Sequence, residues 1–157
     1  MTNLPDPQYV YHGSHELFEE VVPHRQRRLN KQGEVIFDQV SFHATPYKWI
    51  AISYMSNRKG RKTGVDLYNH HPVVAIFDRG SLEDSLKSMY SGGGYLYTFD
   101  KNDFHHTEGL GNLEVITTSS PKPVKVERID DPVAELKKLG VEFDFIDLNK
   151  EENAKYR

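Results

Sequence analysis

Cysteine is absent from this chain of 157 residues. Its absence excludes disulfide bonds, thiolate metal sites and a cysteine nucleophile. Long apolar runs are absent too, and none approaches the roughly 20 residues that a membrane-spanning helix needs. The opening segment, MTNLPDPQYV, has neither the basic nor the apolar region of a signal peptide. We therefore expect a soluble, cytoplasmic protein with no membrane partner.

An excess of basic residues is also missing. The chain has 20 Lys and Arg residues against 23 Asp and Glu residues, which gives a net charge of −3. This balance excludes a global positive field that would attract nucleic acid. Two local basic runs remain, HRQRR at 24–28 and RKGRK at 58–62. They are either solvated loops or phosphate contacts, so nucleic acid stays open as a partner, and together they can form a positive rim around a dinucleotide site.

Large aromatic side chains are the main apolar resource of the sequence. Phe, Tyr and Trp number 8, 9 and 1, whereas hydrophobic residues make up only 37% of the chain. Aromatic rings bury a large area per residue, so these side chains suffice for one modest core. We predict a single domain over residues 1–157, in which residues 141–157, ending in a stretch rich in Glu, Asn and Lys, form a C-terminal tail.

Turn residues divide the chain into strands and a few helices. Apolar runs predict strands at 9–12, 35–45, 73–79, 95–100, 113–120 and 124–130. Capping residues and helical spacing predict helices at 46–56, 81–90 and 132–139. In the first helix, Thr45 would be the N-cap, and one face would turn Tyr47, Ile50, Ala51 and Tyr54 toward the core. Because strands and helices do not alternate regularly, we predict an α+β fold with largely antiparallel pairing.

Histidine and glycine clusters do not indicate metal or phosphate sites. The adjacent histidines at 70–71 and 105–106 would project to opposite faces of a strand, and no HExxH spacing occurs. We therefore expect no metal site. The glycine run at 92–94 is followed by the strand-like YLYTFD instead of a helix, which favours a hairpin turn over a phosphate-binding loop.

Three strand-associated segments stand out: YHGS near the start, SFHATPYKWIAISY in the middle and NLEVITTSS late in the chain. In order and local character they resemble the ADP-ribosyltransferase fold, specifically its His-Tyr-Glu branch, which includes the poly-ADP-ribose polymerases. The resemblance covers roughly Tyr9 to Asp130. It implies two small, mainly antiparallel β-sheets around an NAD cleft, with flanking helices. It also implies that the protein cleaves the nicotinamide–ribose bond of NAD, its co-substrate, and transfers ADP-ribose to an acceptor or to water.

The resemblance also assigns roles to individual residues. His12 would hydrogen-bond a ribose hydroxyl of the adenosine half, and Gly13 would leave its backbone open to the carboxamide of nicotinamide. Tyr54 would stack on the nicotinamide ring, and the Glu114 carboxylate would stabilise the oxocarbenium-like transition state. The implied catalytic residues are Glu114 and His12. The implied NAD-binding residues are His12, Gly13, Ser14, Phe42, Thr45, Ser53 and Tyr54.

Two positions depart from the family pattern. Phe42 stands where a tyrosine is usual, so the ring is kept and the hydroxyl is lost. Asn112, two residues before Glu114, is neither Glu nor Gln, which disfavours arginine as the acceptor and leaves the acceptor unidentified. Two alternatives stay open. One is a catalytically silent nucleotide- or nucleic-acid-binding module of the same fold. The other is an NAD-dependent RNA 2′-phosphotransferase that would use Arg25, Arg27 and Arg28.

Each candidate residue also has a purely structural explanation. The HGS segment can be a simple turn, Phe42 and Tyr54 can serve the core, and Glu114 can face solvent. The functional hypothesis requires one geometric arrangement that the structural explanations do not require. His12 and Glu114 must face each other across a shared cavity that is wide enough for a nicotinamide riboside.

Overall fold

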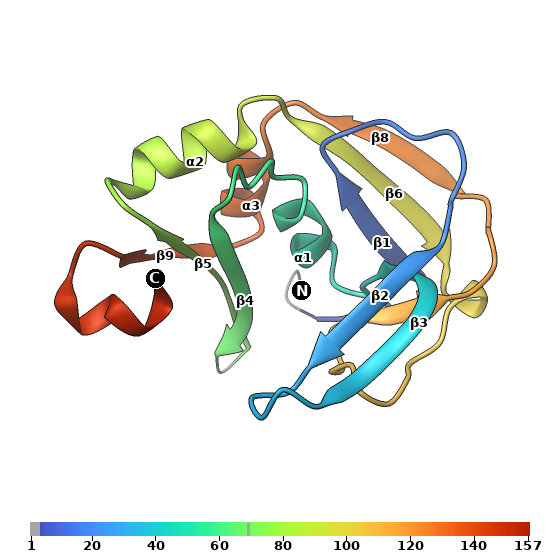
Figure 1. The fold of residues 1–157 in the computed structure, drawn as a ribbon. Helices are drawn as coiled ribbons and strands as arrows, with labels where there is room; N and C mark the ends of the chain where they lie inside the picture. Colours follow the sequence, from blue (N-terminus) through green and yellow to red (C-terminus); the bar gives the residue numbers. More distant parts are fainter. Residues whose placement is uncertain (1–3, 69) are drawn as a thin grey trace.

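The computed structural model describes residues 4–68 and 70–157. Within them the strands form three sheets of three strands each, arranged around a short central helix (Figure 1). The strand orders are β1-β6-β8, β2-β3-β7 and β4-β5-β9. The strands are β1 (Tyr9–Ser14), β2 (His24–Leu29), β3 (Val35–Ala44), β4 (Lys62–Tyr68), β5 (His71–Asp78), β6 (Gly94–Asp100), β7 (Val115–Thr117), β8 (Lys125–Ile129) and β9 (Glu142–Asp147).

Pairing within the described sheets is antiparallel except between β5 and β9, which run parallel. The prediction of an α+β fold with mainly antiparallel sheets is therefore confirmed. The structure has a third sheet, β4-β5-β9, beyond the two that the resemblance implies. Of its strands only β5 was predicted, since β4 begins in the basic run at 58–62 and β9 lies in the predicted tail. The polar run before Leu29 was also expected to be a loop, yet it forms β2, the edge strand paired with β3.

Strand β9 corrects the prediction that residues 141–157 are a tail. It pairs with β5 from Val73↔Glu142 to Asp78↔Asp147. Its apolar and acidic residues alternate with the period of two that marks a strand buried on one face. On that face Phe143 and Phe145 pack against the main core. The short 3-10 helix η2 (Glu151–Tyr156) follows, and the Tyr156 ring contacts Phe77 at 5.2 Å between centroids.

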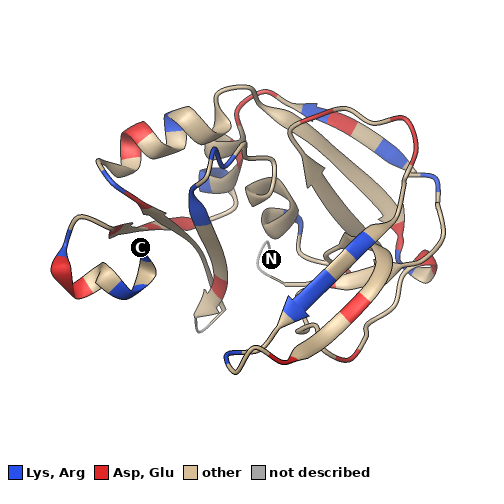
Figure 2. Cartoon of the chain, in the orientation of Figure 1, with Lys and Arg blue, Asp and Glu red and all other residues tan. Residues whose placement is uncertain are grey.

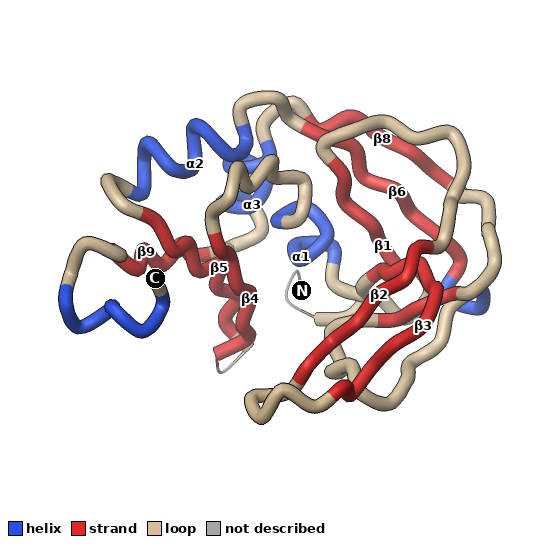
Figure 3. The backbone as a smooth tube through the Cα atoms, in the orientation of Figure 1, coloured by secondary structure: helices blue, strands red, loops and turns tan. Residues whose placement is uncertain are grey.

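Helices α2 (Leu82–Tyr90) and α3 (Pro132–Lys138) confirm their predictions. The Ser81 hydroxyl caps α2 by accepting the Asp84 N–H at 3.2 Å, and the Asp131 carboxylate caps α3 by accepting the Ala134 N–H at 3.1 Å. Figure 3 shows both beside the β4-β5-β9 sheet, whereas α1 lies between the sheets. No helix in the described part of the chain combines the length and the apolar character that crossing a membrane requires.

Helix α1 (Lys48–Ser53) begins two residues later than predicted. Thr45 does not cap it, because the Thr45 backbone exchanges two hydrogen bonds with Tyr11 at 2.7 and 2.9 Å and so continues the strand. The Thr45 hydroxyl instead accepts the Tyr47 N–H at 3.1 Å. The predicted single buried face is also wrong, because every residue of α1 from Trp49 to Ser53 is at most 4% exposed.

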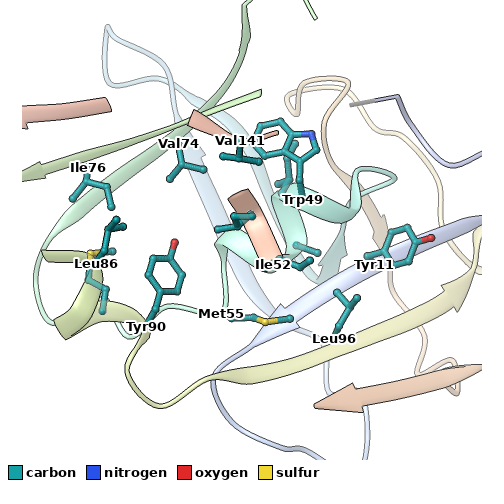
Figure 4. Packing of buried hydrophobic residues seen from close by; sticks show 14 residues of the cluster. Tyr11, Trp49, Ile52, Met55, Val74, Ile76, Leu86, Tyr90, Leu96 and Val141 are labelled. Carbon is teal, nitrogen blue, oxygen red and sulfur yellow. The ribbon is translucent and has the colours of Figure 1, made fainter. Parts of the chain in front are cut away.

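The main core surrounds α1 on several sides. Figure 4 shows Trp49, Ile52 and Met55 between residues of the β4-β5-β9 sheet, such as Val74, and residues of the β1-β6-β8 sheet, such as Leu96. A second cluster joins the first two sheets. It contains Val10, Val21, Phe42, Ala44, Tyr97, Phe99, Phe104 and Val115. The two clusters fix β1 against both α1 and β3, and the candidate site lies where these elements meet.

Candidate functional site

A cleft opens where strands β1 and β3 separate. The Tyr11–Thr45 bridge is the last backbone contact described between them, and beyond it β1 continues to Ser14. The cavity has a volume of about 500 Å³. It is lined by Tyr11, His12, Gly13, Arg28, His43, Ala44, Thr45, Ala51, Tyr54, Arg58 and Glu114. Residues from segments far apart in the sequence thus share one cavity, and His12 and Glu114 both line it.

Gly13 exposes a strand edge to this cleft. The Tyr11 N–H and C=O point toward Thr45, and backbone groups two residues apart in a strand point the same way. The N–H and C=O of Gly13 therefore point away from β6, toward the separated edge. No backbone hydrogen bond joins Gly13 to β3 among the residues that the structure describes. One donor and one acceptor are thus available to a ligand amide.

The missing side chain of Gly13 has a separate, structural cause. A Cβ at this position would lie 1.7 Å from the Ala51 carbonyl oxygen and 3.2 Å from Met55 Cγ. Glycine is required here because α1 packs directly on β1. The predicted role in ligand approach is therefore not the only reason for glycine at this position, since the side-chain direction of Gly13 is occupied by α1.

His12 is held in one orientation by the backbone of the neighbouring strand. Its Nδ1 lies 2.7 Å from the His43 carbonyl oxygen, which can only accept, so Nδ1 carries the proton and Nε2 is left as an acceptor. The imidazole packs on the Phe42 ring at 4.4 Å between centroids and edge-on to Phe18 at 5.7 Å. Burial among these rings lowers the pKa of His12 below 6.5, because the charged form loses hydration.

Glu114 precedes β7, and its carboxylate accepts three hydrogen bonds from two cleft residues. Oε2 accepts from His43 Nδ1 at 2.9 Å, and the guanidinium of Arg28 donates to Oε1 at 3.1 Å and to Oε2 at 3.2 Å. The hydrogen bond from His43, followed by those from Arg28, lowers the pKa of Glu114 below 4.5 although burial opposes the shift. The carboxylate is therefore ionised at neutral pH, and its side chain is only 21% exposed.

Tyr54 closes the cleft from the end of α1. It is 38% exposed, and the Arg58 guanidinium lies 5.8 Å from its ring centroid. Burial of the hydroxyl, together with the charge of Glu114, raises the pKa of Tyr54, so the phenol stays neutral. A ring that is accessible on the cleft side and held beside a carboxylate is suited to stack on a flat, electron-poor ligand ring.

Other predicted ligand residues lie outside the cleft or are already bonded. The Ser53 hydroxyl is buried and donates to the Ile50 carbonyl at 2.6 Å, so it is not free to donate to a ligand. Phe42 is 8% exposed and lies beneath His12 in the second core cluster. Ser14 accepts the Glu16 N–H at 3.1 Å and does not line this cavity. Thr45 lines the cleft, but its backbone belongs to the bridge with Tyr11.

Several cleft residues had no individual role in the predicted NAD site, among them Arg28, Arg58 and His43. The two basic runs were interpreted only as a whole, as a positive rim that can form around a dinucleotide site. Arg28 and Arg58 belong to the two basic runs, and the structure brings one arginine from each run to the same cavity. Figure 2 shows the basic bands of β2 on one side of α1 and those around the start of β4 on the other. His43 received no role. Its position in the sequence could have indicated one, because it is a polar residue between two apolar residues, Phe42 and Ala44, in a predicted strand. Both neighbours are buried in the structure.

A second groove adjoins the cleft on the far side of His12. It has a volume of about 480 Å³ and shares His12, Arg28 and His43 with the first cavity. Its remaining walls are Ser14, Phe18, Glu20, Val22, His24, Gln26, Ser41 and Phe42. No three or more His, Asp and Glu side chains of residues 4–68 and 70–157 converge as a metal site would require.

The chain matches no known protein family, no curated protein and no solved structure. The geometry of the cleft is therefore the basis on which a function can be proposed.

Proposed function

We propose that the cleft binds NAD and that the protein cleaves the bond between nicotinamide and ribose, transferring ADP-ribose to an acceptor or to water. The observation that carries this proposal is that His12, Gly13, Tyr54 and Glu114 all line one cavity of about 500 Å³. A cavity of this size lies within the range of small-ligand sites. The four residues supply different chemistry, and each part of a nicotinamide riboside finds a suitable partner among them.

The nicotinamide end would lie against β1 and α1. Its carboxamide has one donor group and one acceptor group, which complement the open C=O and N–H of Gly13. The ring would stack on Tyr54, and the Nε2 acceptor of His12 would take a hydrogen bond from a ribose hydroxyl. Arg28 and Arg58 would face the phosphates, which are the negative part of the dinucleotide.

Bond cleavage would leave positive charge on the ribose. The C1′–N bond breaks and nicotinamide departs with the electron pair, so an oxocarbenium-like ribose develops. The ionised Glu114 carboxylate would stabilise this charge and accept a hydrogen bond from the 2′-hydroxyl. A nucleophilic group of the acceptor, or water, then attacks C1′ and releases its proton to solvent. The bonds from Arg28 and His43 keep Glu114 ionised before the substrate arrives.

The test is release of nicotinamide from NAD by the purified protein, with and without a lysate as the source of acceptors. Glu114→Gln should lower turnover by about 100-fold or more, the scale found when a group that stabilises developing charge is removed. Glu142→Gln is the matched control, because Glu142 is an exposed carboxylate on β9, outside the cleft. Equal turnover by the wild-type and Glu114→Gln proteins would remove Glu114 from the mechanism.

One observation favours a second candidate, an RNA 2′-phosphotransferase. Arg28 and Arg58 both line the cleft, and this reaction needs cationic groups around a phosphate. Arg25, proposed for the same role, is paired with Asp38 at 2.9 Å and lies outside the cavity. The phosphotransferase would consume NAD only when 2′-phosphorylated RNA is present. A silent binding module would bind NAD or nucleic acid in a salt-sensitive way and release no nicotinamide.

A further inference from the structure

We infer that His43 is a positioning residue of the cleft that supports both proposed catalytic residues at once, His12 through its main chain and Glu114 through its side chain. The inference rests on the proposed function, which it deepens by adding a residue that does not touch the reacting atoms but sets the geometry of two groups that would contact NAD. Three hydrogen bonds and the burial of the imidazole support it.

The backbone half of this arrangement acts on His12. The His43 carbonyl oxygen accepts from His12 Nδ1–H at 2.7 Å. This bond selects the tautomer of His12 whose Nε2 is free to accept from a ligand. It needs only the strand conformation of β3, which the register His43↔Ile116 with β7 maintains. A substitution of the His43 side chain that preserves β3 therefore leaves this bond in place.

The side-chain half acts on Glu114. The imidazole Nδ1 lies 2.9 Å from Glu114 Oε2, and a carboxylate accepts, so Nδ1 carries the proton. Nε2 is then available to accept from the buried Ser41 hydroxyl, which lies 3.1 Å away. Both ring nitrogens are thus bonded, and the imidazole side chain is only 16% exposed. The ring has one orientation that satisfies both contacts, and that orientation points at Glu114.

The same carboxylate also bonds Arg28, but the two partners differ in exposure. The Arg28 side chain is 44% exposed and comes from the edge strand β2, whereas His43 lies in the middle strand of its sheet. Water and salt weaken the exposed ion pair more than the sheltered hydrogen bond. Arg28 can therefore turn toward a ligand phosphate while His43 continues to hold Glu114. We therefore assign to His43 the contact that keeps the Glu114 carboxylate oriented while a ligand is bound.

The experiment compares two substitutions of His43. His43→Asn keeps an N–H donor close to the position of Nδ1, and His43→Leu removes the donor while retaining bulk. His43→Leu should lower kcat for nicotinamide release by about 10-fold to 100-fold, the scale of a lost hydrogen bond to a charged group. The KM for NAD should change little, because the carbonyl contact to His12 remains. His43→Asn should recover most of the lost kcat.

Two further readouts separate positioning from a merely structural role. In His43→Leu the acidic limb of the kcat profile should move to higher pH, because Glu114 loses a bond that favours its ionised form. In a Glu114→Gln background, His43→Leu should cause little additional loss, because the residue through which it acts is already disabled. His71→Leu is the control, since that exposed histidine pairs with Glu142 away from the cleft.

The outcomes distinguish this inference from the proposed function. Wild-type kinetics in His43→Leu, or an equal loss in the Asn and Leu variants, would overturn the positioning role. If the wild-type protein releases no nicotinamide, the proposed function falls. An NMR titration of the Glu114 carboxyl, assigned with Glu114→Gln, then still decides whether His43 holds it. A higher carboxyl pKa in His43→Leu supports the inference, and an unchanged pKa overturns it.

Discussion

Replacing Gly13 with alanine tests how closely β1 and α1 approach each other, and the whole cleft depends on that approach. The added Cβ would lie 1.7 Å from the Ala51 carbonyl oxygen and 2.7 Å from its carbonyl carbon. These atoms belong to the backbone of a buried helix, so no side-chain rotation relieves the overlap. Either α1 or β1 must move, and Tyr54 at the end of α1 would move with the helix.

The expected cost follows from this geometry. Overpacking a core by a methyl group costs about 1–3 kcal/mol, and more where the backbone must shift. We expect a loss of at least ~3 kcal/mol in the free energy of unfolding for Gly13→Ala. In a domain of this size, about 1 kcal/mol corresponds to a decrease of roughly 2–4 °C in Tm, so the Tm should fall by at least about 6 °C. Thermal unfolding followed by circular dichroism measures the change.

Gly64→Ala is the matched control. Gly64 also lies in a strand, no heavy atom lies within 4 Å of its added Cβ, and its φ is outside the positive range. Its Tm should stay within about 4 °C of wild type, because a compatible Gly-to-Ala change is worth about 0.4–1 kcal/mol. Gly94→Ala should resemble Gly13→Ala, because its Cβ would lie 2.7 Å from the Ser14 carbonyl oxygen. A Gly13→Ala protein as stable as the control would refute the close helix–strand contact.

Three other predictions test different parts of the structure. The pKa of His12 is lowered in the folded state, so the free energy of unfolding should be highest above pH 6.5 and should decline as the pH falls from 6.5 through the lowered pKa. Denaturant titrations at several pH values should show a weaker decline for His12→Asn. Arg28→Gln should weaken NAD binding by calorimetry and reduce its salt dependence, whereas Arg25→Gln, outside the cleft, should bind as wild type does. Deleting residues 141–157 removes β9 and should abolish cooperative unfolding, whereas deleting 149–157 should preserve it, as circular dichroism would report.

Local sequence signals were sufficient where an element is decided by its own residues. The caps at Ser81 and Asp131 predicted α2 and α3, because capping is a bond between a side chain and a backbone group three residues away. The apolar run at 9–12 predicted β1, but the strand continues two residues further, to Ser14, so Gly13 and Ser14 belong to the strand and not to a turn. Strand β2 was missed because its residues are mostly polar and basic, and its pairing with β3 satisfies backbone groups that no composition reveals. Strand β9 was missed although Phe143 and Phe145 alternate with acidic residues, because the polar stretch after it indicated a tail and its pairing with β5 joins distant parts of the chain.

The sequence by itself determined that the chain has no cysteine chemistry, that it folds as α+β with mostly antiparallel pairing, and that His12, Gly13, Tyr54 and Glu114 stand on segments able to carry a site. Only the tertiary structure decided that these residues share one cavity and that His43 bonds Glu114 across 71 positions of sequence. It also showed that Gly13 has no room for a side chain, because the backbone of α1 lies against it. Such contacts join residues far apart in the chain, so they depend on how the sheets and helices pack, whereas periodicity and caps act within a few residues.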